Sequence, residues 1–95
     1  MWYKLQFKSK LRGEMDQYAT VKSLIKIAQS TKLTEPVIFC KKKVTESADT
    51  DYYGLLPDHL ARLLSHLYGD VNFVPWEEME IPEYEIIFDS RFAKN

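Results

Sequence analysis

The chain has 95 residues, of which 45% are hydrophobic and 14% aromatic, and its formal net charge is −1. This length predicts one domain spanning residues 1–95, and the composition is that of a folding chain and not of a disordered one. Cys40 is the one cysteine, so the chain must be held together by packing and not by a disulfide framework. The N-terminus has no apolar region typical of a signal peptide, and no apolar run reaches membrane-spanning length. We therefore expect a cytoplasmic protein that does not enter membranes.

The small net charge conceals a strong asymmetry along the chain. Residues 1–43 contain ten basic and three acidic side chains, a balance of +7, whereas residues 44–95 contain three basic and eleven acidic ones, a balance of −8. Such segregation raises the expectation of a charged partner.

The first half of the chain predicts a strand, a helix and a second strand. Tyr3, Leu5 and Phe7 alternate with polar residues, and this phase continues to Leu11 before Gly13, which is typical of a half-buried strand. Residues 16–31 have helical spacing, with Asp16 or Thr20 as the cap and one apolar stripe: Tyr18, Val21, Leu24, Ile25 and Ala28. The apolar run 37–40, followed by three lysines, predicts the second strand.

The second half predicts a strand, a helix and a last strand. Residues 51–56 are expected to form a hairpin with the second strand, although Gly54 weakens this assignment. Pro57 is expected to open a helix whose apolar face carries four leucines: Leu60, Leu63, Leu64 and Leu67. Residues 71–74 form at most a short extended piece, and residues 75–82 are bounded by prolines and irregular. Tyr84, Ile86 and Phe88 then alternate with acidic residues, as in a strand with one solvated face, although Ile87 interrupts the pattern.

These elements give an α+β fold with the order β-α-β-β-α-β. In this order, which is that of the ferredoxin-like fold, two helices pack on one face of a mainly antiparallel sheet. The sequence contains no repeat and no linker.

A row of cations on the first strand suggests nucleic-acid binding as one function. Lys4, Lys8, Lys10 and Arg12 are expected on one strand face beside Trp2, where lysines could contact phosphates and the indole could stack on a base. The run Lys41, Lys42 and Lys43 could add phosphate contacts, although a run of this kind is more often a strand end kept soluble, and successive strand residues point to opposite faces. The third strand also lacks the basic and aromatic signature of common RNA-binding sheets.

The same lysines can be explained by pairing inside the sheet. If the first and last strands are antiparallel neighbours, Lys4, Lys8 and Lys10 face the solvated carboxylates of the last strand, Glu83, Glu85 and Asp89. Cross-strand pairs of opposite charge stabilise a sheet by roughly 0.2–1 kcal/mol each. A partner would then meet a mixed surface and not a basic one.

The segment around Trp76 suggests protein binding as a second function. Tryptophan and methionine are enriched in interface cores, and carboxylates steer a basic partner. We therefore expect a partner-binding segment made of Trp76, Glu77, Glu78, Met79 and Glu80. The alternative is a connector whose tryptophan covers the edge of a thin core while its glutamates face water.

No motif identifies a catalytic or metal site. His59 and His66 are seven residues apart, which places them about two turns from each other on a helix and too far apart for one metal ion. Cys40 precedes lysines that could lower its pKa, but a small buried strand residue explains it better. We assign no catalytic residue, no metal and no cofactor.

The sequence therefore predicts a small non-enzymatic protein-binding module that acts as a regulator, inhibitor or assembly factor. Small domains encoded by phages and mobile elements often act in this way. Nucleic-acid binding through the first strand is the alternative, an enzyme without a recognisable motif is the third hypothesis, and a homodimer is a further outcome for the partner.

Overall fold

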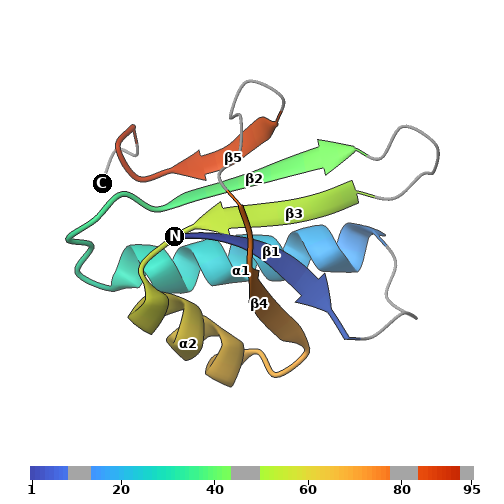
Figure 1. Ribbon diagram of the computed structural model, residues 1–95, viewed down its shortest axis with the longest axis horizontal. Coiled ribbons are helices and arrows are strands. Elements are labelled where there is room, and N and C mark those ends of the chain that lie inside the picture. The colour runs from blue at the N-terminus through green and yellow to red at the C-terminus, as the bar shows by residue number, and fades with distance from the viewer. Residues whose placement is uncertain (9–13, 44–49, 78–83, 93–95) are drawn as a thin grey trace.

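The computed structural model describes residues 1–8, 14–43, 50–77 and 84–92, without the side chains of residues 14, 15 and 43 (Figure 1). The elements follow one another as β1 (Trp2–Phe7), α1 (Glu14–Ser30), β2 (Ile38–Lys43), β3 (Thr50–Leu55), α2 (Asp58–Leu67), β4 (Val71–Pro75) and β5 (Glu85–Asp89). The predicted α+β class and the β-α-β-β-α-β order of the first six elements are confirmed. The proposed continuation of the first strand through Lys10 and Arg12 lies outside the described residues.

The described strands form one antiparallel sheet in the order β4-β1-β3-β2-β5. Figure 1 shows β4 and β5 at opposite edges of this sheet. The prediction that the last strand neighbours the first is therefore wrong. The neighbour of β1 at the edge is β4, the segment expected to be only a short extended piece, and β5 pairs with β2 instead.

Strand β1 has the predicted alternation. Tyr3 and Leu5 are buried and Phe7 packs against the same core, while Trp2, Lys4 and Gln6 lie on the opposite face of the strand. The alternation of apolar and polar residues thus reports correctly which side of β1 meets the helices.

Helix α1 begins earlier than predicted. Because its first residue is Glu14, Asp16 and Thr20 lie within the helix, and the Thr20 hydroxyl donates to the Asp16 carbonyl at 2.9 Å instead of capping the start. Four of the five predicted stripe residues are buried, and the exception is Tyr18, which is 37% exposed.

Helix α2 follows Pro57, which occupies the N-cap position with φ −63° and ψ 150°. The residues that face the core are Leu60, Ala61 and Leu64. The predicted apolar face is wrong in part, because Leu63 is 40% and Leu67 53% exposed. The buried stripe is centred on Leu60, Ala61 and Leu64, so Leu63 lies at its margin, and Leu67 is the last residue of the helix.

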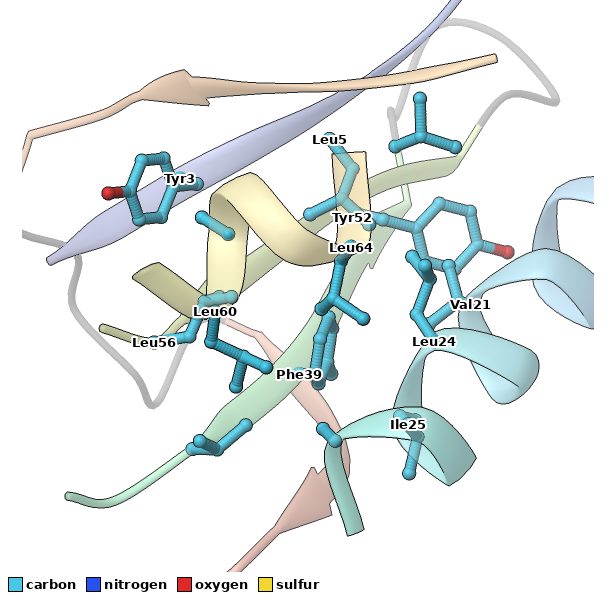
Figure 2. Close-up of a cluster of buried hydrophobic side chains, with 14 residues drawn as sticks. Tyr3, Leu5, Val21, Leu24, Ile25, Phe39, Tyr52, Leu56, Leu60 and Leu64 are labelled. Carbon is cyan, nitrogen blue, oxygen red and sulfur yellow. The ribbon is translucent and has the colours of Figure 1, made fainter. Parts of the chain in front are cut away.

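The main core lies between the two helices and one face of the sheet, and Figure 2 shows its side chains converging from both layers. Phe39 is fully buried at its centre. Gly54 lies beside it on β3, where an added Cβ would approach Leu56 Cδ2 to 2.9 Å and Phe39 Cε1 to 3.3 Å. Close packing against Phe39 of β2 and against Leu56 thus favours a glycine at this position of the strand.

Candidate protein-interaction surface

The face of the sheet opposite α1 and α2, here called the helix-free face, carries the residues that sequence reasoning singled out. The strand register places Lys4 of β1 opposite Tyr53 of β3, and Tyr53 opposite Cys40 of β2. Cys40 and Tyr53 form a small second core, against which Trp2 and Tyr84 pack. These two half-buried rings, together with Tyr53 and Trp76, make up what we call the aromatic cluster.

Tyr53 is the centre of the aromatic cluster. Its ring centroid lies 5.9 Å from that of Trp76 and 5.1 Å from that of Tyr84, and the Tyr84 ring meets it edge-on. Trp76 follows one edge strand and Tyr84 precedes the other, so both described ends of the β4–β5 connection meet at the middle of the sheet. Burial, with smaller effects from Asp51 and Tyr84, raises the pKa of Tyr53 to about 12.

Trp76 is held by its backbone and by its ring, yet it remains 43% exposed. Its backbone N–H donates to the Trp2 carbonyl at 2.9 Å, which extends the β1–β4 pairing by one residue. On the other side, the ammonium of Lys4 lies 5.0 Å from the indole centroid, within cation–π range. Trp76 therefore presents a fixed, half-exposed aromatic surface. Glu77 beside it is exposed, while the predicted partner-binding residues Glu78, Met79 and Glu80 lie outside the described residues.

The described lysines of the two predicted basic groups lie on both faces of the sheet. Lys4 is on the helix-free face, with its Nζ 3.9 Å from Asp51 Oδ2. Lys42 is on the same face, with its Nζ 5.3 Å from the Tyr84 ring centroid. Lys41 points to the helix side, where its Nζ lies 3.7 Å from Glu85 Oε2 and 5.2 Å from the Tyr18 ring centroid. As expected from strand geometry, neighbouring lysines of the run act on opposite faces.

The remaining residues of the nucleic-acid hypothesis are Trp2, Lys8, Lys10, Arg12 and Lys43. Trp2 is half-buried in the aromatic cluster, and Lys8 is exposed just beyond the end of β1. Lys10 and Arg12 lie outside the described residues, as does the side chain of Lys43.

The proposed pairing of the β1 lysines with the last strand is wrong, because β5 and β1 are not neighbours. Lys4 pairs with Asp51 of β3 instead, and Glu85 pairs with Lys41 of β2. Asp89, expected on the solvated face, is only 8% exposed. It accepts hydrogen bonds from Arg91 through its backbone N–H and its guanidinium, at 2.6 to 3.0 Å, and the guanidinium bonds lower the pKa of Asp89.

The single cysteine is buried, and the two histidines are exposed on a helix. Burial raises the pKa of Cys40 to about 12, which keeps its thiol protonated and unreactive. His59 and His66 are both exposed on α2. Among the residues that the structure describes, no group of three or more histidine, cysteine or carboxylate side chains could hold a metal ion.

Sequence reasoning missed two features of the surface. Phe92 is 79% and Ile86 44% exposed near β5, although the alternation placed Ile86 on the apolar side of a strand. A groove of about 620 Å³ lies between α2 and β4, and its lining includes Tyr3, Ala61, Arg62 and Phe73. No local pattern could reveal this groove, because it depends on β4 being an edge strand.

Comparison with protein-family models, curated proteins and solved structures finds no match for this chain. No helix in the described ranges is long and apolar enough to cross a membrane.

Proposed function

We propose that the protein is a non-enzymatic protein-binding module that contacts its partner through Trp76 and the helix-free face, and so acts as a regulator, inhibitor or assembly factor. The observation that carries this proposal is the half-exposed indole of Trp76, fixed between Tyr53 and Lys4. Tryptophan dominates the energetic centres of protein interfaces. A side chain that is already ordered before binding also loses less conformational entropy when the partner arrives.

The charges around Trp76 support a protein partner better than a polyanion. Lys4 lies beside Asp51, so a phosphate approaching Lys4 would also approach a carboxylate. Glu77, exposed next to Trp76, adds a second negative charge to the same region. An aromatic centre surrounded by charges of both signs resembles the anatomy of a protein interface, with its apolar core and polar rim.

The test is capture of the partner by the whole chain carrying a photo-crosslinking residue in place of Glu77. We expect one crosslinked species, which is lost in Trp76→Ala and retained in Trp76→Phe at reduced yield. Phe92→Ala is the matched control, since Phe92 is an exposed aromatic that follows β5, the strand at the sheet edge opposite β4. If Phe92→Ala abolishes the crosslink and Trp76→Ala does not, the binding surface lies elsewhere and the proposal is wrong.

Single-stranded nucleic acid is the second candidate, favoured by one specific arrangement. Lys4 and Lys42 each lie over an aromatic ring on the helix-free face, and a base stacked on such a ring would have a cation within reach of its phosphate. A salt titration of oligonucleotide binding, followed by fluorescence anisotropy, separates the two functions. Affinity that falls steeply with salt and disappears in Lys4→Glu would favour nucleic acid, and no binding at low salt would exclude it.

A further inference from the structure

The two edges of the sheet differ in how well they could receive another strand. At the β5 edge, the register with β2 shifts between Phe39 and Cys40, so Ile87 is an extra residue in β5. A bulge of this kind bends an edge strand and discourages further pairing. At the other edge, the pairing of β4 with β1 runs without a shift from Val71 to Pro75. The regular edge is therefore that of β4.

The hydrogen bonds of β4 show which of its backbone groups point away from the sheet. The Asp70 carbonyl accepts from the N–H of Lys8, just beyond β1, and the Trp76 N–H donates to Trp2 of β1. The backbone groups in phase with these two, those of Asn72 and Val74, therefore also face β1. The backbone groups of Val71, Phe73 and Pro75 therefore point outward. Val71 is already occupied, because its N–H donates to the Tyr68 carbonyl at 3.0 Å and its carbonyl accepts from the Ser65 hydroxyl at 3.2 Å.

Three outward groups remain on this edge: the N–H and carbonyl of Phe73 and the carbonyl of Pro75. No strand in the described ranges lies beyond β4 to bond them. The outward groups of Phe73 and Pro75 are two residues apart, as are the successive bonding positions of an antiparallel pair. Three such groups can bond a short extended segment but not a long strand.

The groove of about 620 Å³ between β4 and α2 runs along the same edge. A residue paired with Phe73 would direct its side chain toward the helix side of the sheet, where the half-buried Phe73 ring and Ala61 line the groove. The charges there are already matched: Arg62 Nε lies 3.0 Å from Asp58 Oδ2, and the Tyr3 hydroxyl donates to Asp58 Oδ1 at 3.2 Å. A groove with balanced charges and an apolar wall selects an uncharged, apolar side chain.

We propose that β4 binds an extended peptide segment of the partner by strand addition, with an uncharged apolar side chain of that segment in the α2–β4 groove. This inference rests on the proposed function, since Trp76 directly follows β4. In the bound peptide, the two neighbours of the residue in the groove would point to the helix-free face, where Trp76 lies. Backbone hydrogen bonds would supply affinity and the groove would supply selectivity, as in other complexes formed by strand addition.

The probe is a display library of random heptapeptides, selected on the whole chain without its natural partner. We expect enrichment of peptides with an apolar, uncharged residue flanked by strand-forming residues. An enriched peptide is then resynthesised with one N-methyl group at each amide in turn. Strand addition predicts alternation, in which methylation of the amides that face β4 lowers affinity at least tenfold and methylation of those between them has little effect.

Two protein variants complete the test. Phe73→Ala removes only the ring, whereas Phe73→Pro also removes the outward N–H, so Phe73→Pro should bind the peptide more weakly than Phe73→Ala. The N-methyl series needs no altered protein and decides the matter even if Phe73→Pro does not fold. A library without enrichment, or an enriched peptide without alternation, overturns strand addition. The proposal is also overturned if light scattering shows a dimer that Phe73→Pro converts to a monomer, since a second copy of the chain would then occupy the β4 edge.

The proposed function has its own separate readout. If the Glu77 crosslink depends on Trp76 while the peptide series shows no alternation, the protein-binding proposal stands and strand addition fails. If the peptide series alternates while the crosslink is insensitive to Trp76→Ala, the edge binds peptides but Trp76 is not the contact.

Discussion

Trp76→Ala should destabilise the fold as well as remove the proposed contact, and the size of the effect follows from the burial of Trp76. The side chain is 43% exposed, so just over half of its surface is covered, chiefly on the aromatic cluster. A fully buried tryptophan removes up to about 250 Å² from water, and at about 25 cal/mol per Å² the covered part corresponds to roughly 3.5 kcal/mol as an upper estimate. We therefore expect a loss of about 2–3 kcal/mol in the free energy of unfolding, a large part of the stability of a small domain.

Equilibrium urea unfolding, followed by far-UV circular dichroism, measures this loss. Trp76→Phe retains a ring against Tyr53 and should lose only about 1 kcal/mol, whereas Phe92→Ala, at a site that is 79% exposed, should change stability by less than about 0.5 kcal/mol. If Trp76→Ala is as mild as Phe92→Ala, the indole is not held on the sheet and the argument from a fixed aromatic surface fails. If it is as large as expected, the crosslinking comparison must rely on Trp76→Phe and on conditions in which both variants are folded.

Three further predictions concern individual side chains. Arg91 lowers the pKa of Asp89 below 3.8, so the ionised carboxylate stabilises the fold above that pH, and this stabilisation is lost as the pH falls through the lowered pKa. In urea titrations, the difference in unfolding free energy between wild type and Asp89→Asn should therefore shrink below pH 3.8. Gly54→Ala should cost about 1–3 kcal/mol in thermal or urea unfolding, since the new methyl group would meet Leu56 at 2.9 Å, and an unchanged midpoint would show that Leu56 moves freely. With its pKa raised to about 12, Cys40 should react with a thiol reagent at mildly alkaline pH only as fast as the protein unfolds; rapid labelling of the native protein would contradict its burial.

The elements of the fold could be predicted from the sequence because they depend on local geometry. Alternation in β1 requires only that successive side chains point to opposite faces, and it placed Tyr3 and Leu5 correctly in the core. The interruption at Ile87 coincides with the shift in the β2–β5 register, so a break in an alternating pattern reported a real bulge.

The order of the strands could not be predicted in the same way. Residues 71–74 are few and precede a proline, which is typical of a connector, whereas the longer alternation at 84–88 favours a strand beside β1. Pro75 is in fact compatible with β4 because this strand is at the edge of the sheet, where the missing N–H faces away from β1. One misplaced strand was enough to give Lys4 the wrong carboxylates and to hide the groove beside α2.

The meaning of the charge asymmetry changes once the strands are placed. The basic and acidic residues are separated along the chain but lie side by side in the folded protein. The antiparallel sheet places Lys4 beside Asp51 and Lys41 beside Glu85. These pairs are partly exposed, so each contributes little to stability, but each cancels much of the field that a distant polyanion would sense. Among the residues that the structure describes, the charges around Trp76 therefore do not form a basic patch with long-range attraction for a polyanion. A partner that binds there should associate at rates and affinities that change only modestly with salt, in contrast to the steep dependence expected for contacts with several phosphates.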